Sequence, residues 1–226
     1  MKRITIGIFL FLVLISFPSV KAQSLSASAM KKVTVGVDVF TDMWFNVPAS
    51  VNLGTVNPSA NTYITYNLEV GDSKKFTFGI GLGIGNHNMY SKNSTIENVK
   101  GDTIKFIPVA SSLKMKRSKL SVTYLEIPLE LRFKSKSGIK VSLGFKLGYL
   151  IDSKEKYVGS TATSSSLQII KRKKISQLNG FSYSPTLRFG YKSFNLFFSY
   201  ALGPVFRVGH GPALHPMSLG ITLTPF

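Results

Sequence analysis

Residues 120–226 repeat one unit, a stretch of alternating apolar and polar residues followed by a break. The breaks are alternately short, at 134–138 and 192–193, and long, at 152–177 and 204–215. Alternation with period two is typical of β-strands that bury one face. Connections that alternate between short and long predict antiparallel strands that run up and down between two different environments.

The same pattern extends toward the N-terminus and gives eight strands in all. We expect them near residues 33–45, 61–70, 75–85, 120–133, 139–151, 178–191, 194–203 and 216–226. Eight such strands predict an all-β fold, an eight-stranded antiparallel up-and-down transmembrane β-barrel. The short turns would face the periplasm and the long loops the exterior, with both chain ends on the periplasmic side.

The first 22 residues have the features of an export signal. Met1, Lys2 and Arg3 form a charged start, residues 4–17 are an apolar run, and 20–22 resemble a cleavage site. A retained membrane anchor is the alternative, but the apolar run is short for a spanning helix. The expected organisation is therefore a signal peptide at 1–22, a short periplasmic segment at 23–32, and an integral outer-membrane barrel at 33–226.

The contents of the polar face decide which side of the strands points inward. In 124–133, Leu125, Ile127 and Leu129 alternate with Glu126 and Glu130. In 75–85 the apolar residues alternate with glycines, which suit a crowded interior and weaken a solvated strand. A soluble lipocalin-like barrel with the opposite orientation is the alternative. We expect the apolar face to contact lipid.

Charged residues on the polar face nearly cancel and would pair inside a narrow barrel. An eight-stranded barrel has no spare lumen for a wide channel, so such pairs would fill it. The candidate luminal ion-pair network comprises Asp38, Glu69, Glu126, Glu130, Arg132, Lys140, Lys146 and Arg188.

Aromatic residues near the expected strand ends indicate interfacial girdles. They are Trp44, Phe45, Tyr63, Tyr124, Phe133, Tyr149, Tyr183, Tyr191, Phe194 and Tyr200. The final strand is less regular, because Leu219, Ile221 and Leu223 are out of phase with Phe226. The last aromatic residue of an outer-membrane barrel, which signals its insertion, usually lies in phase with the apolar face. Either Pro225 makes a bulge that restores the phase, or Phe226 is not such a signal.

The chain is strongly basic, with a formal net charge of +18. Without the signal, 25 basic residues face 10 acidic ones, which leaves +15. An exported protein does not meet nucleic acid, and 13 of these cations fall in two long loops. Lysine and arginine above the membrane would bind phosphates of lipopolysaccharide. Docking of an envelope protein partner, or a merely solvated and mobile surface, are the alternatives. The candidate anion-binding loop residues are Lys114, Lys116, Arg117, Lys171, Arg172, Lys173 and Lys174.

The stretch 124–133, which reads YLEIPLELRF, resembles the YLEIPL strand of the PorT-like outer-membrane β-barrel proteins. Residues 200–203 and 218–221 also resemble that family. The resemblance implies a signal peptide and an eight-stranded barrel. It also implies, less directly, an accessory role in a type-nine secretion and gliding machinery.

Neither catalysis nor a cofactor has a motif in this chain. His87, His210 and His215 are expected at outer strand ends or loops, near Asp42, Asp152 and Ser218, but spacing alone does not make a catalytic triad. With no Cys, there is no disulfide and no thiol metal site. We therefore expect no catalytic, cofactor-binding or metal residues and a structural or binding role. A lipid-A-modifying enzyme is the third candidate, after the secretion subunit.

Overall fold

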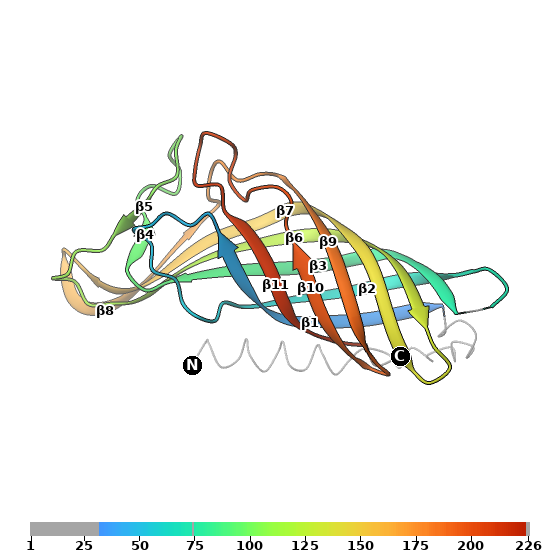
Figure 1. The fold of residues 1–226 in the computed structure, drawn as a ribbon. Coiled ribbons are helices and arrows are strands. Elements are labelled where there is room, and N and C mark those ends of the chain that lie inside the picture. The colour runs from blue at the N-terminus through green and yellow to red at the C-terminus, as the bar shows by residue number, and fades with distance from the viewer. Residues whose placement is uncertain (1–31, 74, 225–226) are drawn as a thin grey trace, which may run out of the picture.

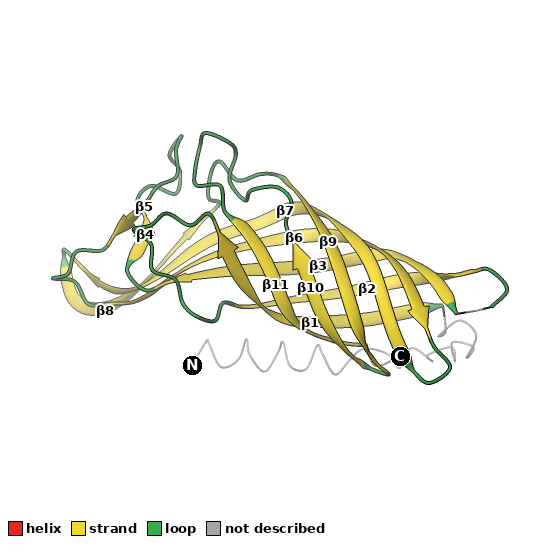
Figure 2. Ribbon diagram, in the orientation of Figure 1, coloured by secondary structure: helices red, strands yellow, loops and turns green. Residues whose placement is uncertain are grey.

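A computed structural model describes residues 32–73 and 75–224. The expected signal at 1–22, nearly all of the segment at 23–32, and Phe226 lie outside the described residues. Among those that are described, no helix is long and apolar enough to cross a membrane. The chain is built from strands (Figures 1 and 2).

Eight strands close into one antiparallel ring. Around the ring the order is β6-β3-β2-β1-β11-β10-β9-β7, and β6 then pairs with β7. β8 pairs with β7 beyond the ring, and β4 and β5 form a separate two-stranded sheet. The expected fold class is confirmed. The strands are β1 (Val33–Phe45), β2 (Pro58–Val70), β3 (Phe76–Ser91), β4 (Ser94–Ile96), β5 (Phe106–Pro108), β6 (Met115–Lys134), β7 (Ile139–Thr161), β8 (Ser164–Lys173), β9 (Phe181–Tyr191), β10 (Phe194–Tyr200) and β11 (His215–Leu223).

The two ends of the barrel differ as the spacing of the breaks predicts. At one end, which we call the short-turn end, tight turns join β2 to β3, β6 to β7, and β9 to β10. The first strand begins and the last strand ends there (Figure 1). The other end, the long-loop end, carries all the long connections together with β4, β5 and β8 (Figure 1).

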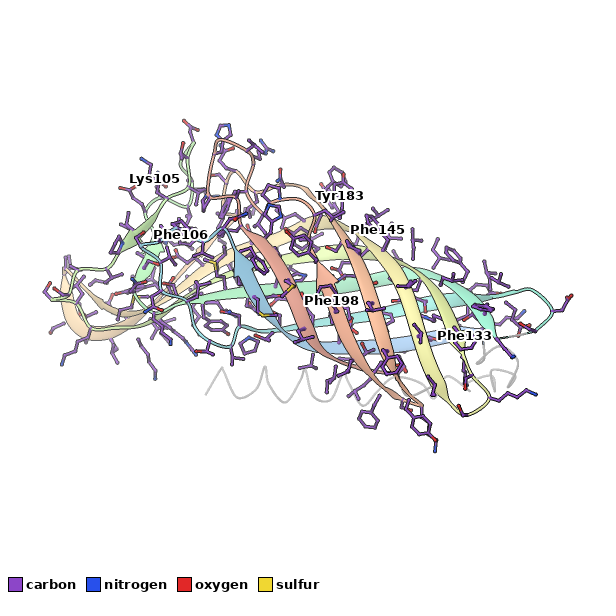
Figure 3. The ribbon with its side chains drawn as sticks, in the orientation of Figure 1. Lys105, Phe106, Phe133, Phe145, Tyr183 and Phe198 are labelled. Atoms are coloured by element: carbon purple, nitrogen blue, oxygen red, sulfur yellow. The ribbon has the colours of Figure 1, made fainter. Side chains whose placement is uncertain are left out.

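The outer wall is apolar over most of its height. Leu143, Leu196 and Phe194 are each more than 60% exposed, and outward residues of the other ring strands are of the same kind. Side chains project outward along the barrel, with Phe133 near the short-turn end and Tyr183 toward the long-loop end (Figure 3). A continuous apolar belt of this extent is incompatible with contact with water and is the surface expected against lipid.

Glycines on the inner wall make room for large charged side chains. A Cβ on Gly85 would lie 2.6 Å from a carboxylate oxygen of Glu126, and one on Gly79 would lie 3.2 Å from the guanidinium carbon of Arg132. The glycine face of β3 therefore points into the lumen.

Three of the aromatic residues expected in interfacial girdles instead point inward. Trp44, Tyr63 and Tyr124 are at most 9% exposed. The indole of Trp44 donates a hydrogen bond to the carbonyl of Asn88 at 3.0 Å. Their alternation explains this, because Trp44 is in phase with Asp38 on the same strand and therefore shares its inward face.

The strands next to two of the long loops are longer than the apolar pattern indicates. β6 begins at Met115 rather than 120, and β7 continues to Thr161 rather than 151. Together with β8 they form a sheet that extends beyond the barrel, which we call the sheet extension (Figure 1). Much of the two basic segments expected as long loops is therefore strand.

Candidate functional site

Arg188 is at the centre of a buried ion network in the half of the lumen nearer the short-turn end. Its guanidinium donates to Asp38 at 2.9 Å and also pairs with Glu130. Arg132 donates to the other oxygen of Glu130 at 2.8 Å. The rings of Tyr63 and Phe197 lie 4.9 and 4.8 Å from the Arg188 guanidinium carbon. Two acids and two bases thus neutralise one another where water is excluded.

A second network lies closer to the long-loop end and includes a histidine. Lys146 donates to Glu126 at 3.0 Å, and the Nε2 of His87 lies 4.0 Å from the same carboxylate. The Nδ1 of His87 lies 3.1 Å from both oxygens of Asp42. The hydroxyl of Ser218 also donates to Asp42, at 2.7 Å. These groups form a continuous polar chain across the lumen.

Six of the eight residues expected in the luminal network lie in these two clusters. They are Asp38, Glu126, Glu130, Arg132, Lys146 and Arg188. Glu69 and Lys140 lie outside both clusters. Glu69 is exposed near the end of β2, and Lys140 is half-buried near the start of β7. Both point inward by alternation, but they are too close to the short-turn end to reach the packed interior.

Asp42 and His87 also belong to the luminal network, although neither was expected in it. His87 was expected at an outer strand end or in a loop, whereas it is buried inside β3. Alternation contains the missing signal, because Asp42 is in phase with Asp38 and His87 with the glycines of β3. The other two histidines hydrogen-bond to backbone carbonyls: His210 to Asp102 and His215 to Ala201.

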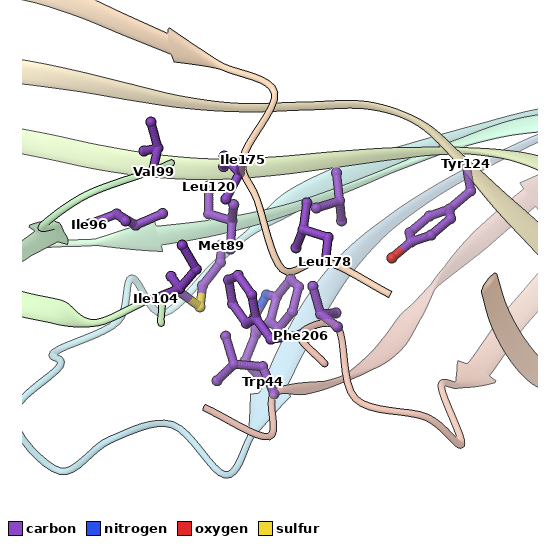
Figure 4. Packing of buried hydrophobic residues seen from close by; sticks show 13 residues of the cluster. Trp44, Met89, Ile96, Val99, Ile104, Leu120, Tyr124, Ile175, Leu178 and Phe206 are labelled. Atoms are coloured by element: carbon purple, nitrogen blue, oxygen red, sulfur yellow. The ribbon is translucent and has the colours of Figure 1, made fainter. Parts of the chain in front are cut away.

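A hydrophobic cluster, which we call the lid, closes the long-loop end above the luminal networks (Figure 4). Inward side chains of three ring strands meet side chains of the folded loops there. Backbone bonds join the loops to one another, for example Ile104 to His210 at 2.8 Å and Ser176 to Val99 at 2.8 Å. The lid comprises Trp44, Met89, Ile96, Val99, Ile104, Leu120, Val122, Tyr124, Ile175, Leu178, Val205, Phe206 and Leu214.

Beneath the lid, a cavity lined by His87, Tyr124, Ser184, Ser199 and Ser218 has a volume of about 10 Å³. This is close to the space of a single water molecule. Ser218 donates its hydroxyl to Asp42 rather than to His87. Ser218 and His87 are therefore both held by Asp42.

A buried carboxylate attaches the sheet extension to the loops. Glu155 is 1% exposed and accepts hydrogen bonds from the backbone N–H of Ile96 at 2.8 Å and the hydroxyl of Ser118 at 2.9 Å. Arg172 pairs with Glu155 and donates to the carbonyl of Ile96 at 2.6 Å. Arg172 was expected among the anion-binding loop residues. Its guanidinium instead points toward β4.

The outer face of the sheet extension carries two rows of lysines. The register places Lys119 opposite Lys156, and Lys156 opposite Lys171. Lys154 lies opposite Lys173 in the neighbouring row. Residues opposite one another in a sheet point to the same face. These five lysines, which we call the basic face, bring together cations from three strands, β6, β7 and β8.

The basic face is electrostatically crowded. Partial burial lowers the pKa of Lys119, and the neighbouring charges of Lys154, Lys156 and Arg117 lower it further. Asp152 is the one acid on this face in the described chain, with a carboxylate oxygen 4.0 Å from the Nζ of Lys154. A bound anion would relieve this repulsion.

Only some of the expected anion-binding residues belong to the basic face. Lys171 and Lys173 do, and Arg117 lies opposite Val158 on the same outer side, one row above Lys119. Lys114 lies just before β6, and Lys116 is exposed at a register shift near its start. Lys174 follows β8, and its carbonyl accepts a hydrogen bond from the Nζ of Lys100. Lys119, Lys154 and Lys156 were not among the candidate anion-binding residues, because their alignment depends on the strand register.

A comparison with protein families identifies the family to which the chain belongs. The model of a family described as "Outer membrane protein beta-barrel domain" matches residues 22–207. The chain belongs to this family. The protein is accordingly an integral outer-membrane β-barrel, as the apolar belt indicates.

Solved structures similar to this outer-membrane barrel include two of Ail, the attachment invasion locus protein of Yersinia pestis. One is in complex with the heparin analogue sucrose octasulfate (12% identity, 85% of this chain and 96% of that chain, TM-score 0.42), and the other is Ail itself (14%, 85% and 97%, 0.43). The outer membrane protease OmpT from Escherichia coli is also similar (9%, 85% and 93%, 0.37). No curated protein matches.

Proposed function

We propose that this outer-membrane barrel is a non-enzymatic binding protein whose basic face binds the phosphates of outer-leaflet glycolipid, lipopolysaccharide. The register that aligns Lys119, Lys156 and Lys171 carries this proposal. Lysine binds phosphate as a compact point charge, and several lysines on one rigid sheet lose less entropy on binding than lysines on mobile loops.

The lower row of the basic face, Lys154 and Lys173, lies at a height above the apolar belt that fits a lipid headgroup. On β7, Ile151 is the last exposed apolar residue before Lys154. Three residues span roughly 10 Å of strand, or about 7 Å of height at a tilt near 45°. The headgroup layer on each side of a bilayer is about 5–8 Å thick. Lys154 and Lys173 would then lie at the level expected of lipid phosphates, and the row of Lys119, Lys156 and Lys171 lies two residues, or about 5 Å of height, further from the membrane.

Binding of glycolipid by purified barrel tests this proposal. In the variant Lys119→Gln, Lys156→Gln, Lys171→Gln, the strands are unchanged and three charges are removed. At about 1 kcal/mol for each cation near an anionic surface, the affinity for lipopolysaccharide should fall by about two orders of magnitude. The barrel should keep its heat-modifiable migration on a gel.

A matched control removes the same charge elsewhere at the long-loop end. Lys92, Lys105 and Arg207 are exposed on other segments, so replacing all three by glutamine should leave binding nearly unchanged. Equal losses in both triple variants would indicate non-specific attraction by net charge. Lipopolysaccharide stripped of its phosphates should bind the wild-type barrel weakly, and equal binding would refute phosphate recognition.

The resemblance of 124–133 to PorT-like proteins favours a second role, as an accessory subunit of a type-nine secretion machinery. Co-purification of the barrel with other envelope proteins from native membranes is its test. A lipid-A-modifying activity is the third candidate, and lipid A of unaltered mass from a deletion strain would count against it.

A further inference from the structure

β8 has a free backbone edge. Each ring strand has a partner on both sides, whereas β8 pairs only with β7, from Lys154 opposite Lys173 to Thr161 opposite Ser164. In the described chain, no loop or turn forms a backbone hydrogen bond with residues 164–173. One row of N–H and C=O groups along β8 is therefore available to another strand.

Much of this edge lacks the features that usually prevent strand pairing. Natural edge strands are protected by lysine, proline, bulges or shortness. The stretch 164–170 of β8 contains no charged residue and no proline, although its pairing with β7 is irregular between Gln168 and Ser164. Two large apolar side chains on it, Leu167 and Ile169, are 61% and 63% exposed. Only the lower part of β8 is cationic, at Lys171 and Lys173.

Lipid does not cover this apolar part of the edge. Ile169 lies opposite Val158, which is seven residues beyond Ile151 on β7. Seven residues span roughly 23 Å of strand, or about 16 Å of height at a tilt near 45°. This is above a headgroup layer of about 5–8 Å. Leu167 and Ile169 are thus apolar, exposed and beyond the membrane.

The outward face of β8 specifies the chemistry of its partner. Leu167, Ile169 and Lys171 follow one another at alternate positions on that face. Across an added strand, apolar residues pair best with apolar residues, and an acid pairs best with a lysine. β8 itself holds no acid, and Glu155 of the neighbouring strand already pairs with Arg172.

A second copy of the chain fits this edge poorly. A two-fold axis that pairs two β8 edges antiparallel is perpendicular to their sheet. Because the barrel wall runs along the membrane normal, that axis lies in the membrane plane and would invert one barrel. Two copies in the same membrane could not then both expose their long loops on the same side.

We propose that the free edge of β8 binds an extended segment of a partner protein by strand addition. The segment carries two apolar residues, opposite Leu167 and Ile169, and an acidic residue opposite Lys171. Backbone hydrogen bonds to the edge supply affinity, and the three alternate side chains supply selectivity.

A synthetic peptide tests the proposal on the full-length barrel in detergent. In the probe, one glutamate and two valines occupy alternate positions and threonines separate them. Binding is followed by fluorescence anisotropy of the labelled peptide. The peptide controls are a peptide of the same composition in scrambled order and two probes, each methylated on one of the two alternate sets of backbone nitrogens.

Two variants of the barrel complete the test. Ile169→Lys places a charge on the edge and should weaken binding of the probe by about tenfold or more. Val208→Lys introduces the same charge at a residue that is 87% exposed in another loop, and it should leave binding unchanged. Unaltered heat-modifiable migration shows that both variants are folded.

Several results would overturn the proposal. The first is that the probe does not bind the wild-type barrel. The second is that the scrambled peptide, or both methylated probes, bind as well as the original probe. The third is that Ile169→Lys and Val208→Lys change binding equally. Self-association of the wild-type barrel that Ile169→Lys abolishes would assign the edge to a second copy instead. Retention of lipopolysaccharide by Ile169→Lys should not fall, because the change adds a cation beside Lys171, so loss of the probe is distinguishable from loss of the basic face.

Discussion

Replacing Glu130 by alanine should destabilise the barrel far more than any change on its surface. Glu130 is 2% exposed and pairs with both Arg188 and Arg132. Its removal leaves Arg188 with Asp38 and leaves Arg132 with neutral acceptors, among them Asn67 at 2.6 Å. One positive charge then remains uncompensated in the lumen.

Breaking a buried ion pair by removing one partner costs about 3–5 kcal/mol. Because both arginines keep other partners, we expect the lower end of that range, about 3 kcal/mol. Lys171→Ala changes an exposed side chain and should lie within about 0.5 kcal/mol of the wild type. Glu130→Gln preserves the size of the side chain. If charge rather than packing is responsible, Glu130→Gln should show most of the loss of stability that Glu130→Ala shows.

Urea unfolding of barrels in phospholipid vesicles measures these differences. Trp44 is the single tryptophan of the chain and is buried in the lid, so its fluorescence reports unfolding. Equal, small effects of Glu130→Ala and Lys171→Ala would refute a packed, charge-neutral lumen. A small loss of stability in Glu130→Gln together with a large loss in Glu130→Ala would indicate that the carboxylate acts mainly by filling space.

Further predictions concern topology, the sheet extension and pH. Cysteines placed at Ser112 and Ser165 should react with an impermeant thiol reagent on intact cells and one at Ser193 should not; the reverse pattern would invert the barrel. Glu155→Ala should increase proteolysis of the long loops because it leaves Arg172 unpaired, while the barrel stays heat-modifiable; unchanged proteolysis would contradict the role of this buried pair. The pKa of Lys119 lies below the ordinary lysine value of 10.5, so retention of lipopolysaccharide should weaken at a lower alkaline pH in the wild type than in Lys119→Arg. Identical pH profiles would contradict a contribution of Lys119 to binding.

The strands of the barrel could be predicted because the lipid and the packed lumen each impose a period of two. β1 was expected at 33–45 and is found there. The sheet extension could not be predicted in this way. Lysines form its outer face and folded loops cover much of its inner face, so the contrast between apolar and polar residues disappears. β8, rich in serine, was therefore assigned to a loop.

Alternation predicted that Asp38, Glu130 and Arg188 point inward and pair across the lumen, but it could not predict which acid pairs with which base. Asp38 and Arg188 are 150 residues apart in the sequence and meet only because the ring closes. The same limit applies to the basic face, where a shift of register would separate Lys119 from Lys156. Inward positions follow from local chemistry, whereas contacts follow from ring closure and strand register.

Native mass spectrometry of the barrel extracted from its own outer membrane tests the proposed binding role most directly. The wild type should carry phosphorylated glycolipid through gentle extraction. The variant in which Lys119, Lys156 and Lys171 are all glutamine should lose it, while the control with Lys92, Lys105 and Arg207 replaced should keep it. A wild-type barrel free of glycolipid, or equal retention by both triple variants, would contradict the account.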